Sequence, residues 1–190
     1  EVFRATGPVS ATRSRVKIGV TKDGRITAAE AEMIFQAGAF TGSMFDNAPK
    51  AMFTRYNLEN VKTVSYEVVS NRAKVNAFRA PCVPQVTFAV ESLIDELAKK
   101  LDMDPLELRL RNAASEGYTT LYGETLGPIG YVETLEAAKK CDHYLSPLPA
   151  GQGRGISTGF WFNRGGDTTG SLTITPDGSV TIMLGTSDVA

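Results

Sequence analysis

The chain of 190 residues is long enough for one good hydrophobic core, or for one domain and part of another. Its apolar fraction of 42%, charged fraction of 22% and net charge of −1 give no electrostatic case for nucleic acid or an anionic membrane. Since no run of about 18 apolar residues is present either, neither nucleic acid nor a membrane is expected as a partner.

The first predicted elements form a hairpin. Residues 16–20 alternate in polarity, and Lys22-Asp23-Gly24 follows as a turn. Over 26–37 apolar residues recur at every second position, which predicts a strand although alanine and glutamate favour helix locally. A loop and a short helix are expected over 38–54, and the alternation over 61–69 predicts a third strand.

Three helices are expected next. Between Val86 and Leu101 apolar residues recur at steps of three and four, and Pro84 falls near the first helical position. Asp104-Pro105-Leu106-Glu107 then starts a second helix, in which the aspartate caps and the glutamate reaches back as a capping box. That helix should run to about residue 114. A third helix is predicted over 132–141.

The last part of the chain is broken by glycine and proline. Residues 145–155 are the best candidate for a linker. A short strand is expected near 156–162, a polar turn over 163–170, and a hairpin around Pro176-Asp177-Gly178. Its Asp-Gly turn repeats that of the first hairpin, through either internal duplication or chance. The predicted fold class is α+β, with mixed sheets, β-hairpins and amphipathic helices.

The cysteines and the histidine point to no metal centre. Cys82 and Cys141 lie far apart, without metal-ligand spacing, and His143 is the only histidine. We therefore expect reduced thiols, no metal ligand among the side chains and a cytoplasmic location.

Arg79 lies on a short irregular segment just before the long helix. Free N–H groups and the positive end of the helix dipole suit an anion there, such as a phosphate or a charged metal-oxo group. Alternatively, the arginine pairs with a nearby carboxylate in a proline-rich connection. A phosphate-binding enzyme is the weakest hypothesis, because no glycine-rich loop with a lysine is present.

Residues 77–112 contain Ala-Phe-Arg-Ala-Pro-x-x-Pro-Gln and, further on, Asp-Pro-Leu-Glu-Leu-Arg-Leu-Arg-Asn. This run resembles the large, molybdenum-binding subunit of the xanthine dehydrogenase, aldehyde oxidase and carbon monoxide dehydrogenase family. The resemblance implies an internal fragment of the two-domain molybdopterin-binding region of a longer subunit. Residues 1–146 would form most of the first domain, 147–154 a linker and 155–190 the start of the second domain.

The resemblance also implies a chemistry. The whole protein would be a molybdenum hydroxylase that oxidises an aldehyde or an N-heteroaromatic compound with water-derived oxygen. Its cofactor would be molybdenum-molybdopterin, in the plain or the cytosine dinucleotide form. Its partners would be the remainder of the molybdenum subunit, iron–sulfur and FAD subunits or domains, and a small-molecule substrate. The family's catalytic glutamate is not in this chain, so no catalytic residue is expected and the chain alone should be inactive.

Five site residues follow from the resemblance. Phe78, Arg79 and Ala80 match the turn that approaches the cofactor. Pro81 falls where xanthine oxidoreductases carry a phenylalanine that stacks on a flat substrate, which disfavours purine-like substrates. Phe160 aligns with a phenylalanine beside the substrate, although packing into the core explains it equally well.

Cys82 replaces a glycine of the family motif and is expected to be buried rather than reactive. The rival hypothesis, from another functional class, is a non-catalytic α+β domain whose helix and hairpins serve packing or subunit contacts. Substituting Arg79 separates the two hypotheses.

Overall fold

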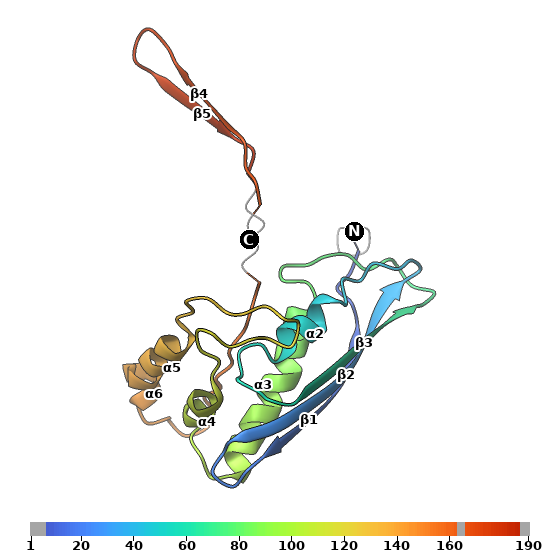
Figure 1. Cartoon of the computed structure of the whole chain (residues 1–190), viewed down its shortest axis with the longest axis vertical. Helices are drawn as coiled ribbons and strands as arrows, with labels where there is room; N and C mark the ends of the chain where they lie inside the picture. Colours follow the sequence, from blue (N-terminus) through green and yellow to red (C-terminus); the bar gives the residue numbers. More distant parts are fainter. Residues whose placement is uncertain (1–6, 163–165, 187–190) are drawn as a thin grey trace.

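The computed structural model describes residues 7–162 and 166–186. Figure 1 shows a body, in which helices cover a sheet, and a hairpin that extends away from it. Helices and small mixed and antiparallel sheets confirm the predicted α+β class. Within the described residues, no helix is both long enough and apolar enough to cross a membrane.

The sheet of the body has three strands in the order β1, β2, β3. β1 (Thr12–Val20) pairs antiparallel with β2 (Ile26–Gly38), which confirms the first predicted hairpin. β2 then pairs with β3 (Val61–Val69) in parallel, and α2 (Asn47–Met52) lies in the connection between them. Alternation in the sequence predicted the strands, but it carries no information on their relative direction.

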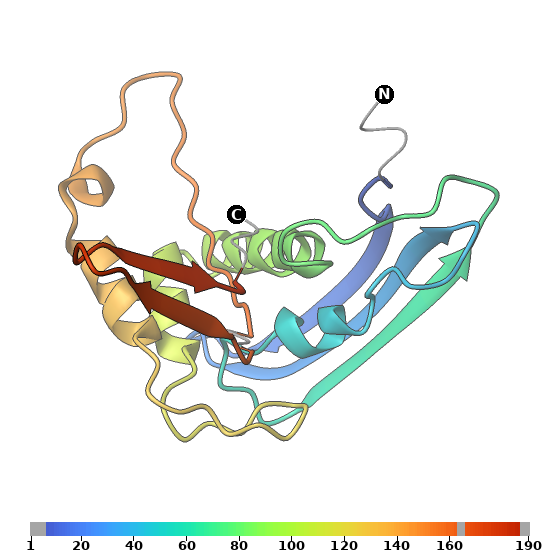
Figure 2. The ribbon, with the colours of Figure 1, turned by 90° about the horizontal axis from the view of Figure 1, so that it is seen from above.

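The core lies between the sheet and the long helix α3 (Val83–Lys100), as the periodicity of the sequence predicts. Val86, Val90 and Ile94 of α3 are buried in one cluster with Met33 and Phe35 of β2. Burying a side chain of this size contributes about 1.5–3 kcal/mol. Figure 2 shows α3 and α2 beside the strands, on the side that carries this cluster.

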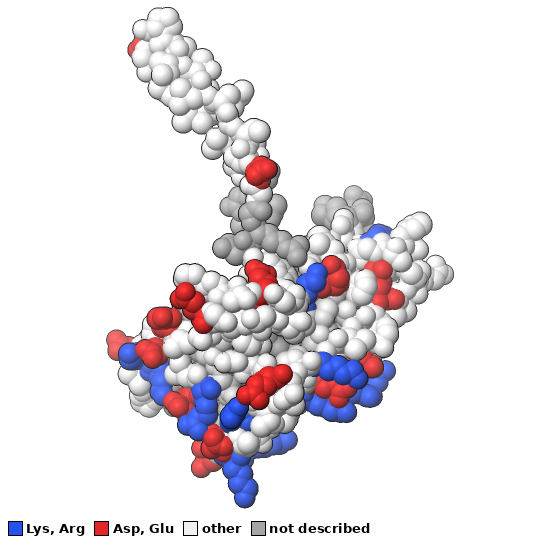
Figure 3. All heavy atoms as spheres, in the orientation of Figure 1, with Lys and Arg blue, Asp and Glu red and all other residues white. Residues whose placement is uncertain are grey.

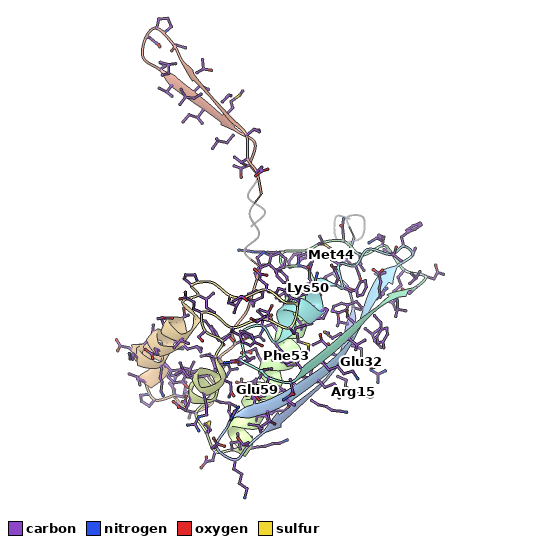
Figure 4. All side chains as sticks on the ribbon, viewed as in Figure 1. Arg15, Glu32, Met44, Lys50, Phe53 and Glu59 are labelled. Atoms are coloured by element: carbon purple, nitrogen blue, oxygen red, sulfur yellow. The ribbon has the colours of Figure 1, made fainter. Side chains whose placement is uncertain are left out.

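The opposite face of the sheet is solvated and charged. Arg15 and Glu32 are paired across β1 and β2 and project from this face (Figure 4). Glu30 lies between Lys17 and Lys62, at 3.6 and 3.5 Å from them. Lysine, arginine and glutamate side chains accordingly gather along this part of the surface (Figure 3). The body therefore has one buried and one wet sheet face, as expected for a sheet covered on one side.

Three shorter helices follow: α4 (Pro105–Asn112), α5 (Tyr131–Lys140) and α6 (Asp142–Leu145). The Asp104 carboxylate accepts from the backbone N–H of Glu107 at 2.9 Å, so the predicted cap is confirmed. The other half of the capping box is wrong, because the Glu107 carboxylate accepts from Lys139 of α5 at 2.6 Å instead. The Glu107 side chain thus bonds to a neighbouring helix rather than back to the start of its own helix.

The strand predicted near 156–162 is wrong: the segment is irregular and pairs with no described strand. Its backbone groups bond to side chains instead, since the Thr158 N–H donates to Glu91 and the Ile156 carbonyl accepts from Arg109. Of the turn predicted over 163–170, residues 163–165 lie outside the described residues.

The second predicted hairpin is present. β4 (Gly170–Ile174) and β5 (Val180–Leu184) pair antiparallel around the Asp-Gly turn, and every one of their residues is exposed. The division into domains at 147–154 and the duplication of the hairpins stay predictions.

Candidate functional site: a groove beside the Arg79 turn

The turn before α3 has an unusual backbone. Ala80 and Cys82 adopt left-handed conformations, with φ of 53° and 68° on either side of Pro81. Such a conformation costs a residue with a Cβ about 1–2 kcal/mol. Two contacts hold the turn: the Val83 N–H donates to the Ala80 carbonyl at 3.0 Å, and the Cys82 thiol donates to the Ser43 carbonyl at 3.2 Å.

The turn also presents unused donors. Within residues 7–162 and 166–186, the backbone N–H groups of Phe78, Arg79 and Ala80 have no hydrogen-bond acceptor. Arg79 is exposed and, over the same residues, forms no ion pair, so the carboxylate partner considered as an alternative is not seen there. Successive free N–H groups next to a left-handed residue and a guanidinium are groups that can bind an anion.

A groove of about 810 Å³ begins at this turn and runs between α3 and the edge strand β1. Residues 78–81 form one end of it. Its sides combine apolar and small polar side chains: Thr12, Ser14 and Val16 from β1, and Phe88, Ser92 and Leu93 from α3. The volume lies in the range of small-molecule and cofactor sites.

Two residues that line this groove each carry a buried oxygen without a hydrogen-bond partner among the described residues. Ser43 is only 6% exposed, and its Oγ forms no hydrogen bond with any described residue. The same holds for Oε1 of Gln85, whose amide Nε2 reaches only the Ser10 carbonyl, at 3.5 Å. A buried polar atom left unpaired costs about 1–3 kcal/mol. Both oxygens have almost no accessible surface, so the groove offers a ligand its lining hydroxyls and the charge of Arg79 rather than these two atoms.

Cys82 lies in the wall of the groove and is 4% exposed, which confirms the predicted burial. Burial, with Asp46 and Glu67 adding to it, raises the pKa of its thiol to about 11. The thiol is therefore protonated at neutral pH and donates to Ser43 rather than acting as a nucleophile.

Of the predicted site residues, the structure brings Phe78, Arg79, Ala80 and Pro81 together at the groove. Phe160 does not line it. The Phe160 ring is half-buried and packs edge-on against that of Phe162, with 5.3 Å between their centroids.

A buried ionic cluster is the feature that the sequence patterns missed. Glu91 of α3 is 3% exposed and accepts from Arg55 Nε at 3.0 Å, Tyr56 Oη at 2.5 Å and Arg109 Nε at 2.9 Å. Although burial opposes it, the two guanidinium groups hold the pKa of Glu91 below its usual value. The one signal in the sequence is a carboxylate next to the apolar stripe of α3.

Comparison with known proteins shows the family to which this chain belongs. The model described as "Molybdopterin cofactor-binding domain" matches residues 1–113, which include the sheet, α3 and the Arg79 turn. The chain belongs to this family. The match confirms the resemblance seen in residues 77–112.

Its relatives are subunits of molybdenum enzymes. The nicotinate dehydrogenase large molybdopterin subunit of Eubacterium barkeri is 34% identical over 128 residues, which is 65% of this chain and 30% of that protein. The xanthine dehydrogenase molybdenum-binding subunit of Escherichia coli O157:H7 is 31% identical over 147 residues, or 74% of this chain and 19% of that protein.

A solved structure agrees with the fold. Aldehyde oxidoreductase from Desulfovibrio gigas is similar with a TM-score of 0.71 at 26% identity, over 93% of this chain and 21% of that one. The chain thus spans less than a third of each of these three relatives.

Proposed function

We propose that the chain is part of a molybdenum hydroxylase and that Phe78, Arg79 and Ala80 seat its molybdenum-molybdopterin cofactor. The observation that carries the proposal is the Arg79 turn, whose residues line a groove and whose N–H groups and guanidinium have no acceptor among the described residues. Relatives named as molybdopterin subunits support this assignment.

The donors at the groove fit such a cofactor chemically. Backbone N–H groups and a guanidinium suit the anionic oxygens of a phosphate or a metal-oxo group. Thr12, Ser14 and Ser92 add polar side chains along the groove, and their hydroxyls can hydrogen-bond to a polar ligand. When bound, the cofactor supplies a two-electron oxidation centre, and the chain's own residues bind and orient it.

The substrate class follows from the relatives and from Pro81. We propose an aldehyde or an N-heteroaromatic compound, in which a C–H becomes a C–OH with oxygen from water while two electrons and two protons leave. Pro81 lines the groove next to Arg79 and offers no aromatic ring for stacking. Phe160 would make a second substrate contact, together with parts of the protein outside this chain.

We propose the remaining partners and the form of the pterin because the chain belongs to this family. The electrons would pass to iron–sulfur clusters and FAD on partner subunits or domains, within a cytoplasmic assembly. The pterin would be either the plain or the cytosine dinucleotide form. Because the base that removes the proton is expected elsewhere in the molybdenum subunit, the chain alone should not turn over substrate.

The first experiment measures molybdenum and pterin per mole of the native assembly that contains this chain. About one of each is the stoichiometry that one cofactor per subunit requires. Neither, in an intact assembly purified gently from its host, would favour a packing domain that keeps the family's fold without its chemistry.

The second experiment tests the turn. Arg79→Ala in the complete protein should lower molybdopterin occupancy or turnover, because the charged donor is lost. Arg72→Ala, the same change at an exposed arginine away from the groove, is the matched control and should leave both unchanged. Equal cofactor content and activity in the two variants would exclude this role for Arg79.

A further inference from the structure

The Glu91 carboxylate binds a distant part of the chain as well as its two arginines. Its Oε2 accepts from the Thr158 backbone N–H at 2.9 Å and from the Thr158 hydroxyl at 3.1 Å. With Arg55, Tyr56 and Arg109, this makes five hydrogen bonds to one carboxylate. Glu91 therefore joins α3, α4 and the loop after α2 to the segment that leads toward the hairpin.

Residues 154–158, which we name the strap, are held at further points. Arg109 Nη2 donates to the Ile156 carbonyl at 3.1 Å, and the hydroxyls of Tyr131 and Thr158 lie 3.0 Å apart. At the start of the strap, Arg154 donates to the Tyr144 and Ser146 carbonyls at 2.6 and 2.9 Å. A segment whose composition suggests a free linker is thus fixed along its length.

Through Glu91, the strap links α3, which begins at the Arg79 turn, to the segment that carries Phe160. Phe160 follows Thr158 by two residues, so its backbone stays within about 7 Å of that anchor. At the other end, α3 begins at Val83, immediately after the Arg79 turn, and Glu91 lies eight residues further on, or about 12 Å along a rigid helix.

We propose that Glu91 is a positioning residue, which holds Phe160 at a fixed place relative to the Arg79 turn through its hydrogen bonds to Thr158. This inference rests on the proposed function. Glu91 touches neither substrate nor cofactor in this role, and it acts through the strap.

The chemistry of the cluster favours orientation over simple stabilisation. Replacing buried ion pairs by apolar side chains of similar volume is often neutral or stabilising. Here, one buried nitrogen, Arg55 Nη2, even lacks a partner among the described residues. Directional bonds from Glu91, Arg109 and Tyr131 to Ile156 and Thr158, by contrast, define a single placement of the strap in a way that apolar contacts do not.

The test uses Thr158→Val in the complete protein that carries this chain. Valine keeps the branched shape and the backbone N–H but removes the hydroxyl that bonds to Glu91 and Tyr131. Thr158→Ser, which keeps the hydroxyl, is the conservative rescue. Thr87→Val is the matched control, because Thr87 lies one turn from Glu91 on α3 and its buried hydroxyl has no partner among the described residues.

Two readouts are needed. Amide hydrogen exchange of residues 154–162 should become about tenfold faster in Thr158→Val, as expected for losing one hydrogen bond to a charged group. KM for an aldehyde or N-heteroaromatic substrate should rise about tenfold, with molybdenum content and kcat nearly unchanged, because only substrate placement is affected. Thr158→Ser and Thr87→Val should match the unaltered protein in both.

Unchanged exchange would overturn the link between Glu91 and the strap. Faster exchange with an unchanged KM would show that the cluster only stabilises the fold, and it would overturn the positioning role. Failure of the proposed function looks different: the unaltered protein would then lack molybdenum, and the positioning role would fall with it. If Thr158→Val does not fold, Thr158→Ala, which removes the same hydroxyl with a smaller side chain, takes its place.

Discussion

The two hairpins of the chain share a turn chemistry but differ in what surrounds them. The β1–β2 hairpin buries alternate residues of β2 against α3, whereas in the β4–β5 hairpin Leu172 and Ile182 are 58% and 60% exposed. An Asp-Gly turn therefore fixes strand pairing, but burial comes from partners far away in the sequence. A two-stranded hairpin alone is marginally stable in water. The comparison predicts that matched substitutions in the two regions will have unequal effects.

The largest difference should come from charged side chains. Glu91→Ala leaves the buried Arg55 guanidinium without an ion pair and leaves Arg109 with Asp95 alone, so it should lower the free energy of unfolding by about 3–5 kcal/mol. Asp177→Ala, at the exposed tip of the second hairpin, should leave the midpoint for unfolding of the body unchanged. Urea denaturation followed by circular dichroism measures both. Equal effects would mean that the hairpin and the body unfold together.

Apolar side chains give the next contrast. Ile94 is fully buried, so Ile94→Ala should destabilise the chain by about 2–5 kcal/mol. Ile182→Ala in β5 should stay within about 0.5 kcal/mol, as at other surface sites. The same pair in the complete protein sharpens the comparison: an Ile182→Ala effect that approaches that of Ile94→Ala there would identify a packing partner for the hairpin outside this chain.

Glycines with positive φ give a smaller contrast. A Cβ on Gly38, at the end of β2, would lie 2.1 Å from the Ala73 carbonyl oxygen, so Gly38→Ala should cost about 2–4 kcal/mol. Gly178 has a similar φ of 84° but open space around it, so Gly178→Ala carries only the backbone strain of about 1–2 kcal/mol. Thermal unfolding of the two variants checks this order, and a milder Gly38→Ala would contradict the close backbone approach.

The smallest effect should be that of pH. Because the pKa of Glu91 is lowered in the folded protein, its contribution to stability is complete above the unfolded value, near 4.3, and is lost as pH falls through the folded value. Urea midpoints should therefore be level from pH 7 to about 5 and fall below about 4. Glu91→Ala should show a shallower fall. An equally steep fall in that variant would assign the pH dependence to other carboxylates.

Local chemistry explains most of what the sequence could predict about the fold. Three of these features depend only on residues close together in the sequence: the apolar periodicity of α3, the Asp104 cap and the alternation in β2. The segment near 156–162 could not be assigned in that way, because its partner Glu91 is 67 residues away. The same separation explains why the buried cluster was missed: the alternation and periodicity rules do not report which side chains meet across the fold.

In the candidate site, too, local motifs were predictable and contacts between distant residues were not. Residues 78–81 were predicted from one contiguous motif, and they do meet at the groove. Ser43 joins them from a loop that is fixed by the Glu67 carboxylate, which accepts from the N–H groups of Gly42 and Ser43. No pattern in residues 38–54 indicated this, since the contact depends on how β3 lies beside the loop.

The partners of Glu91 lie far apart in the sequence, and this has a consequence for folding while the chain is being translated. Arg109 follows Glu91 by 18 residues, but Thr158 follows it by 67. At translation rates of about 5–20 residues per second, the carboxylate waits about 3–13 s for its last two donors. During that interval the nascent domain already has its core helix and its ion pairs. Oε2 of Glu91 accepts from Arg109 but still lacks its two hydrogen bonds from Thr158. Closure of the strap therefore comes late in completing the body, and a ribosome that pauses before residue 158 would hold the domain without the hydrogen bonds that Thr158 makes to Glu91 and Tyr131.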